Sequence, residues 1–137
     1  MIVLDTNVIS ELMKKPADPA VATWFLAHEN QIVLPTPAIG EIAFGIARLP
    51  HGARRRDLEA KLTDWRIRYA DLTLSFTAAS AMTYGTVMAA ALKSGHNMTV
   101  VDAQIAAVAL EHGYKLATRN IKDFETTDLK LINPWTA

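Results

Sequence analysis

The stretch Met1-Ile2-Val3-Leu4-Asp5-Thr6-Asn7 decides how the rest of the chain can fold. The three aliphatic residues after Met1 are too few for a helix and too uniformly apolar for a strand with one solvated face. Such a run is typical of a strand buried on both faces, in a parallel sheet covered by helices. The polar residues that follow open a helix, with Thr6 or Asn7 as its predicted N-cap. Asp5 therefore stands at the carboxyl end of a buried strand, where open α/β sheets bind ligands.

Further short apolar runs alternate with helical patterns along the chain, and they predict four more strands at 32–34, 72–74, 115–118 and 131–132. This alternation favours a doubly wound, parallel α/β sheet. The helix after Pro35 is expected to use Thr36 as its cap, with Glu41 roughly opposite its apolar stripe. The Ala-rich helix at 77–94 is apolar nearly all round, so it is expected either to be buried or to face another protein chain.

Composition sets limits on the class of protein. The 137 residues, half of them hydrophobic, suit a single domain over 1–137. Basic and acidic residues number 14 each, so any contact with a polyanion must come from local patches. The absence of cysteine excludes disulfides and thiolate sites and is typical of a reducing compartment. With no secretion signal and no membrane-spanning stretch in the sequence, we expect a cytoplasmic protein that does not enter a membrane.

Four acids are candidates for a shared site. Asp5, Asp102 and Asp123 stand at predicted element boundaries, and Glu41 lies one turn into its helix. If the first and fourth strands are neighbours, the three aspartates converge on one edge of the sheet. Two carboxylates about 4 Å apart repel by roughly 1 to 4 kcal/mol, so such a cluster requires a cation. Oxygen ligands suit Mg²⁺ or Mn²⁺, which assist the attack of water on a phosphodiester.

Each acid also has a purely structural interpretation. Asp102 follows Thr99 by three residues and could be the partner in a capping box. Glu41 could be a solvated surface acid, and Asp123 could be an ordinary turn residue. Asp5 is the hardest to explain in this way, because a buried carboxylate must find a partner or shift its pKa.

Several polar residues adjoin these acids in the sequence. They could support the site or contact phosphate, or they could serve only as caps and turn residues: Thr6, Asn7, Thr118 and Asn120. Arg119 could hold a nucleic-acid backbone or offset the acids. The run Arg54-Arg55-Arg56 is more typical of a solvated helix end than of an RNA contact.

Other chemistries lack their motifs. The four histidines show no paired metal-ligand spacing, and the chain has neither a Gly-rich phosphate loop nor a G-x-S-x-G elbow. An aspartyl phosphatase at Asp5 would be expected to carry a second acid two positions on, where this chain has Asn7.

Taken together, several segments of the sequence resemble the PIN-domain ribonuclease toxins of toxin-antitoxin pairs, in the branch that includes VapC and FitB. The similarity spans nearly the whole chain and rests on Ile2 to Glu11, Glu41, Val101 to Ala107, Ala117 to Phe124, and Ile132 to Trp135. The resemblance implies a three-layer α/β/α sandwich with a central parallel five-stranded sheet, usually as a homodimer. It implies an acidic quartet that binds Mg²⁺ or Mn²⁺, made of Asp5, Glu41, Asp102 and Asp123, with Thr6, Asn7, Thr118 and Asn120 in support.

The implied activity is endonucleolytic cleavage of RNA, held in check by a small antitoxin that also binds operator DNA. A second hypothesis gives the chain a binding role, as a non-catalytic or weakly catalytic partner in a DNA-bound toxin-antitoxin repressor. The zero net charge and the Ala-rich helix fit a chain that is kept beside partners.

Overall fold

The strand β1 (Ile2–Leu4) lies at the centre of a five-stranded parallel sheet in the computed structural model, which describes all 137 residues. The strand order is β3-β2-β1-β4-β5. Val3 pairs with Val33 on one side and with Leu116 on the other, so β1 is enclosed by neighbours. The other strands are β2 (Ile32–Pro35), β3 (Thr73–Leu74), β4 (Lys115–Ala117) and β5 (Leu131–Ile132).

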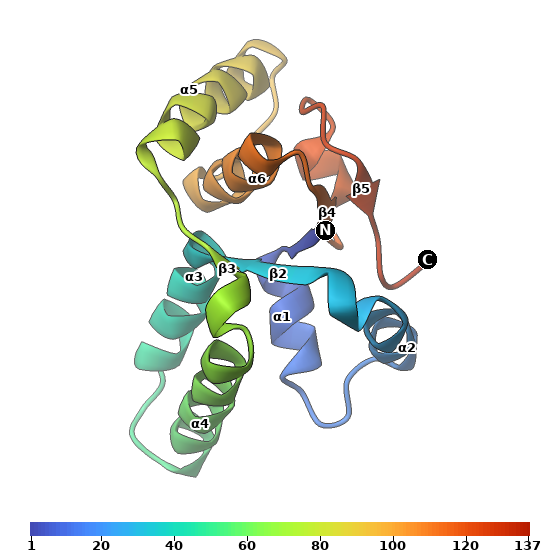
Figure 1. The fold of residues 1–137 in the computed structure, drawn as a ribbon. Coiled ribbons are helices and arrows are strands. Elements are labelled where there is room, and N and C mark those ends of the chain that lie inside the picture. Colours follow the sequence, from blue (N-terminus) through green and yellow to red (C-terminus); the bar gives the residue numbers. More distant parts are fainter.

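Helices cover both faces of this sheet (Figure 1). One face carries α1 (Thr6–Leu12), α2 (Pro19–His28), α3 (Thr36–Ala47) and α4 (Ala53–Arg68). The other face carries α5 (Ala78–Lys93) and α6 (Val100–His112). Short 3₁₀ turns complete the chain at η1 (Glu29–Gln31), η2 (Ala70–Leu72) and η3 (Ile121–Phe124). The predicted fold class, a three-layer α/β/α sandwich with a parallel five-stranded sheet, is confirmed.

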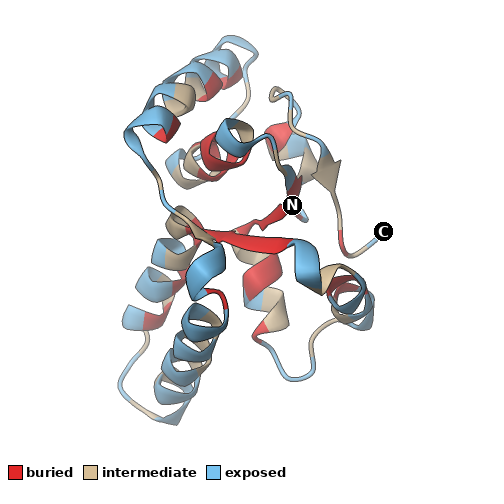
Figure 2. Ribbon diagram, viewed as in Figure 1, coloured by how far each residue is buried: buried red, intermediate tan, exposed pale blue.

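The core is centred on the strands and on α6. Every residue of β1 and β2 is buried, as their uniformly apolar sequences predict. In α6, the alanines at 103, 106, 107 and 109 are buried together with Ile105 and Val108, and these residues pack α6 between the sheet and α5. Figure 2 shows this buried centre, with the exposed residues on the outer helices.

The Ala-rich helix α5 packs mainly against α6 and leaves its other side in solvent (Figures 1 and 2). Only Ser80, Val87 and Ala91 of α5 are buried, whereas Met82 is 78% and Leu92 is 77% exposed. The first of the two expectations for this helix, burial inside the chain, is therefore wrong. The second, contact with another protein chain, stays a prediction.

Two predicted N-caps are also wrong. The side chain of Asp5 caps α1, because its Oδ1 accepts a hydrogen bond from the Thr6 backbone N–H at 2.8 Å. The helix α3 already includes Thr36, whose hydroxyl instead accepts from the Phe76 N–H at 3.0 Å and ties α3 to the segment after β3. None of the helices has the length and apolar character that crossing a bilayer requires.

Candidate active site

The strand order places a crevice between β1 and β4. The chain moves outward from β1 to β2 and β3 on one side, and from β4 to β5 on the other, so the direction of winding reverses between β1 and β4. At such a switch point the loops that follow the two strands separate, and ligands bind outside the strands' carboxyl ends. Asp5 directly follows β1, and Thr118 directly follows β4.

Asp5 is held at this point by several donors. It is only 3% exposed, and its Oδ2 accepts a hydrogen bond from the Thr118 hydroxyl at 2.7 Å. The same oxygen accepts from Asn7 Nδ2 at 3.3 Å, and Oδ1 accepts from the Thr6 N–H. The Asp5 backbone N–H extends the sheet by donating to the Ala117 carbonyl at 2.9 Å. These contacts fix the position of the carboxylate, but none of them is an ion pair with a positively charged side chain.

An open pocket of about 410 Å³ lies in front of Asp5. Glu41 reaches it from α3, and Asp102 reaches it from the first turn of α6, so acids from three separate segments line one cavity. Glu41 is exposed and Asp102 is half-buried, and both are less fixed than Asp5. The structure thus brings together three of the four predicted acids.

Asp123 stands apart from the pocket wall. It lies in η3, after β4, and is not one of the lining residues. Its carboxylate is nevertheless near enough to Asp102 for its charge to raise the pKa of Asp102. A place for Asp123 in the site stays a prediction.

The capping interpretation of Asp102 is compatible with its place in the pocket. Thr99 is the N-cap of α6, and its hydroxyl accepts a hydrogen bond from the Asp102 backbone N–H at 3.1 Å. The backbone of Asp102 thus closes the helix end while its side chain faces the pocket with Glu41 and Asp5.

The electrostatics of the pocket disfavour the ionised forms of Asp5 and Asp102. Burial raises the pKa of Asp5 from 3.8 to about 6; the Thr118 and Thr6 hydrogen bonds oppose this shift, while the charges of Asp102 and Glu41 add to it. Burial also raises the pKa of Asp102, the Thr99 hydrogen bonds lower it, and the charges of Asp123 and Glu41 raise it further. Like charges in a partly desolvated pocket repel, and a bound cation would relieve that repulsion.

The donor set fits a hard divalent cation in its chemistry. All three acids offer oxygen, and the Thr6 hydroxyl oxygen in the pocket wall is buried without a hydrogen-bond partner in the chain. As the side chains lie, no three His, Asp or Glu residues are close enough to hold one ion. Coordination would therefore require Glu41 and Asp102 to turn toward Asp5, which their exposure permits.

The other predicted residues surround the same pocket. Asn7, Arg119 and Asn120 line it, while Thr118 lies behind Asp5, fully buried. Asn7 links the two strand ends, because its Nδ2 donates to Asp5 and its Oδ1 accepts from the Arg119 N–H at 3.3 Å. A role for any of them toward RNA stays a prediction.

Sequence reasoning missed four residues of the wall: Ser10, Glu11, Lys14 and Trp135. Ser10 and Lys14 follow Thr6 at steps of four, a helical spacing that could have placed them on the same side of the chain. Glu11 ties Lys14 at 3.2 Å and accepts from the Asp18 N–H at 3.0 Å, so it fixes the loop after α1. Nothing in the local pattern places Trp135, near the end of the chain, beside Asp5.

A smaller hollow of about 280 Å³ adjoins the pocket and shares Thr6, Ser10, Lys14 and Glu41 with it. Arg54, from the Arg54-Arg55-Arg56 run, lines this hollow. Arg55 instead bonds within its own segment, to the Leu49 carbonyl at 3.1 Å and to Glu59 at 3.3 Å. Arg54 is thus the member of the run that faces the site.

Comparison with known proteins agrees with this geometry. The family model for the PIN domain matches residues 2–129. The chain belongs to the PIN-domain family. It is 39% identical to VapC ribonuclease Y4jK of Sinorhizobium fredii, over 98% of both chains, and 31% identical to Toxin FitB of Neisseria gonorrhoeae, over 98% of this chain and 99% of that one.

Among solved structures, FitAB bound to an IR36 DNA fragment is similar at a TM-score of 0.89, with 29% identity over 98% of this chain and 96% of that chain. The resemblance to the VapC and FitB branch of PIN domains is confirmed. The switch-point pocket is therefore the candidate active site of a PIN domain.

Proposed function

We propose that this PIN domain is an endoribonuclease that hydrolyses RNA phosphodiester bonds with the help of Mg²⁺ or Mn²⁺, and that it acts as the toxin of a toxin-antitoxin pair. The observation that carries the proposal is the meeting of Asp5, Glu41 and Asp102 in one pocket at the switch point of the sheet. Three carboxylates that meet in one pocket repel the phosphates of the RNA backbone unless a cation lies between them. The name of the relative from Sinorhizobium fredii supports nuclease chemistry.

The acids would share the work of holding the cation. Asp5, fixed by Thr118 and Thr6, would be the rigid ligand, and Glu41 and Asp102 would close on the ion from α3 and α6. Asp123 would contribute to the cation site through its neighbour Asp102, either by direct contact or through a bridging water. A divalent ion held there supplies the Lewis acidity that activates water and offsets charge on the phosphate.

Polar residues at the rim would position the RNA. Asn7 and Asn120 offer amide groups on the β1 and β4 sides of the pocket, and Arg119 and Lys14 offer positive charge. The chain has no net charge, so RNA binding would depend on these local groups and weaken as salt rises.

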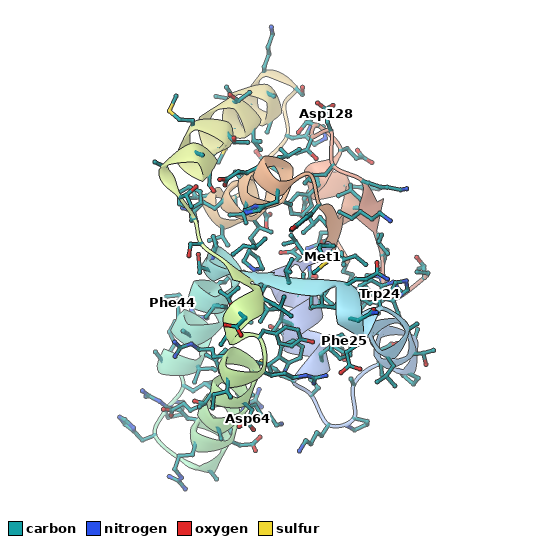
Figure 3. The ribbon with its side chains drawn as sticks, viewed as in Figure 1. Met1, Trp24, Phe25, Phe44, Asp64 and Asp128 are labelled. Atoms are coloured by element: carbon teal, nitrogen blue, oxygen red, sulfur yellow. The ribbon has the colours of Figure 1, made fainter.

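The test of the proposal is cleavage of a labelled RNA by the purified chain with Mg²⁺, with Mn²⁺, and with a chelator. We expect metal-dependent cleavage that falls at least 100-fold in Asp5→Asn and in Asp102→Asn, because each loses a ligand charge. Asp128→Asn is the matched control, since this exposed acid lies in the loop before β5, outside the pocket (Figure 3). Equal cleavage by all four proteins would contradict the proposal.

We further propose that the chain works beside partners: a second copy of itself, through the exposed side of α5, and a small antitoxin that binds operator DNA, all in the cytoplasm. The exposed apolar residues of α5 support a protein contact there. Expression of the chain should arrest growth, and expression of a short neighbouring gene should relieve the arrest. Normal growth with folded protein present would count against the toxin role.

A non-catalytic repressor is the second candidate, favoured by the similarity to a FitAB complex solved on DNA. The two roles make different predictions for Asp5→Asn. A catalytic toxin loses growth arrest in this variant, whereas a repressor partner represses its promoter as well as the original chain does.

A further inference from the structure

The indole of Trp135 lies at the rim of the acid pocket, contributed by the last residues of the chain. It is the single hydrophobic residue in the wall, and it also packs against the core. Its backbone N–H donates to Asn133 Oδ1 at 2.9 Å, and the N–H of Ala137 donates to the Asn133 carbonyl at 2.9 Å. With Pro134 buried, this turn anchors the ring.

Arg119 lies over this ring. Its guanidinium carbon is 4.9 Å from the centroid of Trp135, and its backbone N–H is tied to Asn7. In a pocket with three acids, an arginine would be expected to pair with one of them, yet the Arg119 side chain forms no salt bridge. The face of the Trp135 ring therefore holds the Arg119 side chain at the rim, and the flat guanidinium of Arg119 is not paired with a carboxylate.

From this arrangement we infer that Trp135 and Arg119 form a stacking platform for one unpaired RNA base beside the phosphate that is cleaved. The inference rests on the proposed ribonuclease function and deepens it by defining the substrate as single-stranded at that position. Guanidinium planes and aromatic rings are the groups on which proteins stack splayed bases, and the faces of paired bases inside a duplex are not accessible to them. Trp135 is a positioning residue, and Arg119 is the group that touches the base.

The test compares short RNA oligonucleotides that carry a single abasic residue at successive positions around the mapped cleavage site. With the original chain, one position should show a KM about 10-fold higher when the base is removed, while kcat changes less than about twofold. Arg119→Lys keeps the positive charge and loses the planar guanidinium. Trp135→Leu loses the aromatic ring that supports the guanidinium. In both variants we expect KM for the intact RNA to rise about 10-fold and the penalty for the missing base to disappear.

Trp135→Phe is the conservative control and should retain most of the penalty, because it keeps an aromatic face. Arg119 is exposed, so its variant tests the platform even if Trp135→Leu loses stability. The platform is overturned if abasic RNA is cleaved with unchanged KM at every position, or if Arg119→Lys keeps the full penalty.

A measurement of RNA binding distinguishes failure of the stacking platform from failure of the proposed ribonuclease function. Fluorescence polarisation of the same oligonucleotides with Asp5→Asn, which lowers the negative charge of the pocket, reports base dependence without cleavage. If binding depends on the base but the original chain never cleaves RNA, the nuclease proposal is removed and the platform is kept. Cleavage with no base dependence in binding or in KM would do the reverse.

Discussion

Asp5 is a carboxylic acid that the fold buries without an ion pair to a basic side chain. Its hydrogen bonds to Thr118, Thr6 and Asn7 fix its position, but burial and the neighbouring acids still raise its pKa to about 6. The folded state therefore holds a proton on Asp5 over a range of pH in which the unfolded chain has already lost it.

This has a consequence for the stability of the metal-free protein. The folded-state pKa of Asp5 is raised above 3.8, so its contribution is most favourable below pH 4 and is lost as pH rises to about 6. A shift of this size corresponds to about 3 kcal/mol at neutral pH. Asp5→Asn, which keeps a capping side chain, is expected to stabilise the metal-free protein by about 1 to 3 kcal/mol at pH 7.5.

Urea unfolding with a chelator present measures this difference. It should shrink toward zero near pH 4, and Asp128→Asn should show no comparable pH-dependent gain. Loss of stability in Asp5→Asn at pH 7.5 would show that the carboxylate is favourably paired in the folded chain.

The hydroxyl of Thr118 is the buried donor to Asp5 and also accepts from the Asn120 N–H at 3.0 Å. Thr118→Val keeps the shape and removes both bonds, so we expect a loss of about 1 to 3 kcal/mol at pH 7.5, with the pKa of Asp5 raised further. Thr118→Ser retains the hydroxyl and should lose about 1 kcal/mol for the missing methyl group. Unfolding curves that rank Ser below Val would contradict this account.

At the scale of elements, the sequence predicted the strands and helices well because their signals are local. The uniform apolar runs of β1 and β2, for example, are read from neighbouring residues alone. The N-caps of α1 and α3 were harder to predict. In α1, three polar residues compete for one position, and the extended backbone of Asp5 decides in its favour. In α3, a tertiary bond to Phe76 engages Thr36 instead.

Two glycines illustrate the same local logic and give opposite predictions. Gly113 ends α6 with a φ of +68°, which an alanine adopts at a cost of about 1 kcal/mol. Gly40 lies inside α3 with open space around it, so Gly40→Ala should stabilise the chain by about 0.5 to 1 kcal/mol. Thermal unfolding of Gly113→Ala and Gly40→Ala should shift in opposite directions, and a shared direction would refute the helix-end assignment.

At the scale of the whole molecule, the site depends on strand order, which a local pattern cannot supply. The sequence predicted the four acids one by one, and the strand order, with α3 and α6 packed on opposite faces of the sheet, brought three of them into one pocket. The same strand order brings in Trp135 and Arg119, which no spacing rule connects to Asp5. The sequence left open whether α5 is buried or faces a partner, because composition does not distinguish the two kinds of helix.

The exposed side of α5 predicts a dimer that one charge can disrupt. Met82→Glu should convert a dimer to a monomer, because it places a carboxylate in the apolar contact. Ile67→Glu is the matched control on α4, across the sheet, where the original side chain is 71% exposed. Sedimentation velocity measures the mass of each protein. A monomeric original chain, or a dimeric Met82→Glu, would exclude α5 as the contact.

In the proposed mechanism, carboxylates from distant parts of the chain hold one divalent ion at the switch point. Calorimetric titration of Mn²⁺ into the chelator-treated chain tests it without reference to activity. We predict saturable binding that weakens at least 10-fold in Asp5→Asn and in Asp102→Asn and is unchanged in Asp64→Asn, an exposed acid on α4 (Figure 3). No saturable binding by the original chain, or equal binding by all four proteins, would contradict the account.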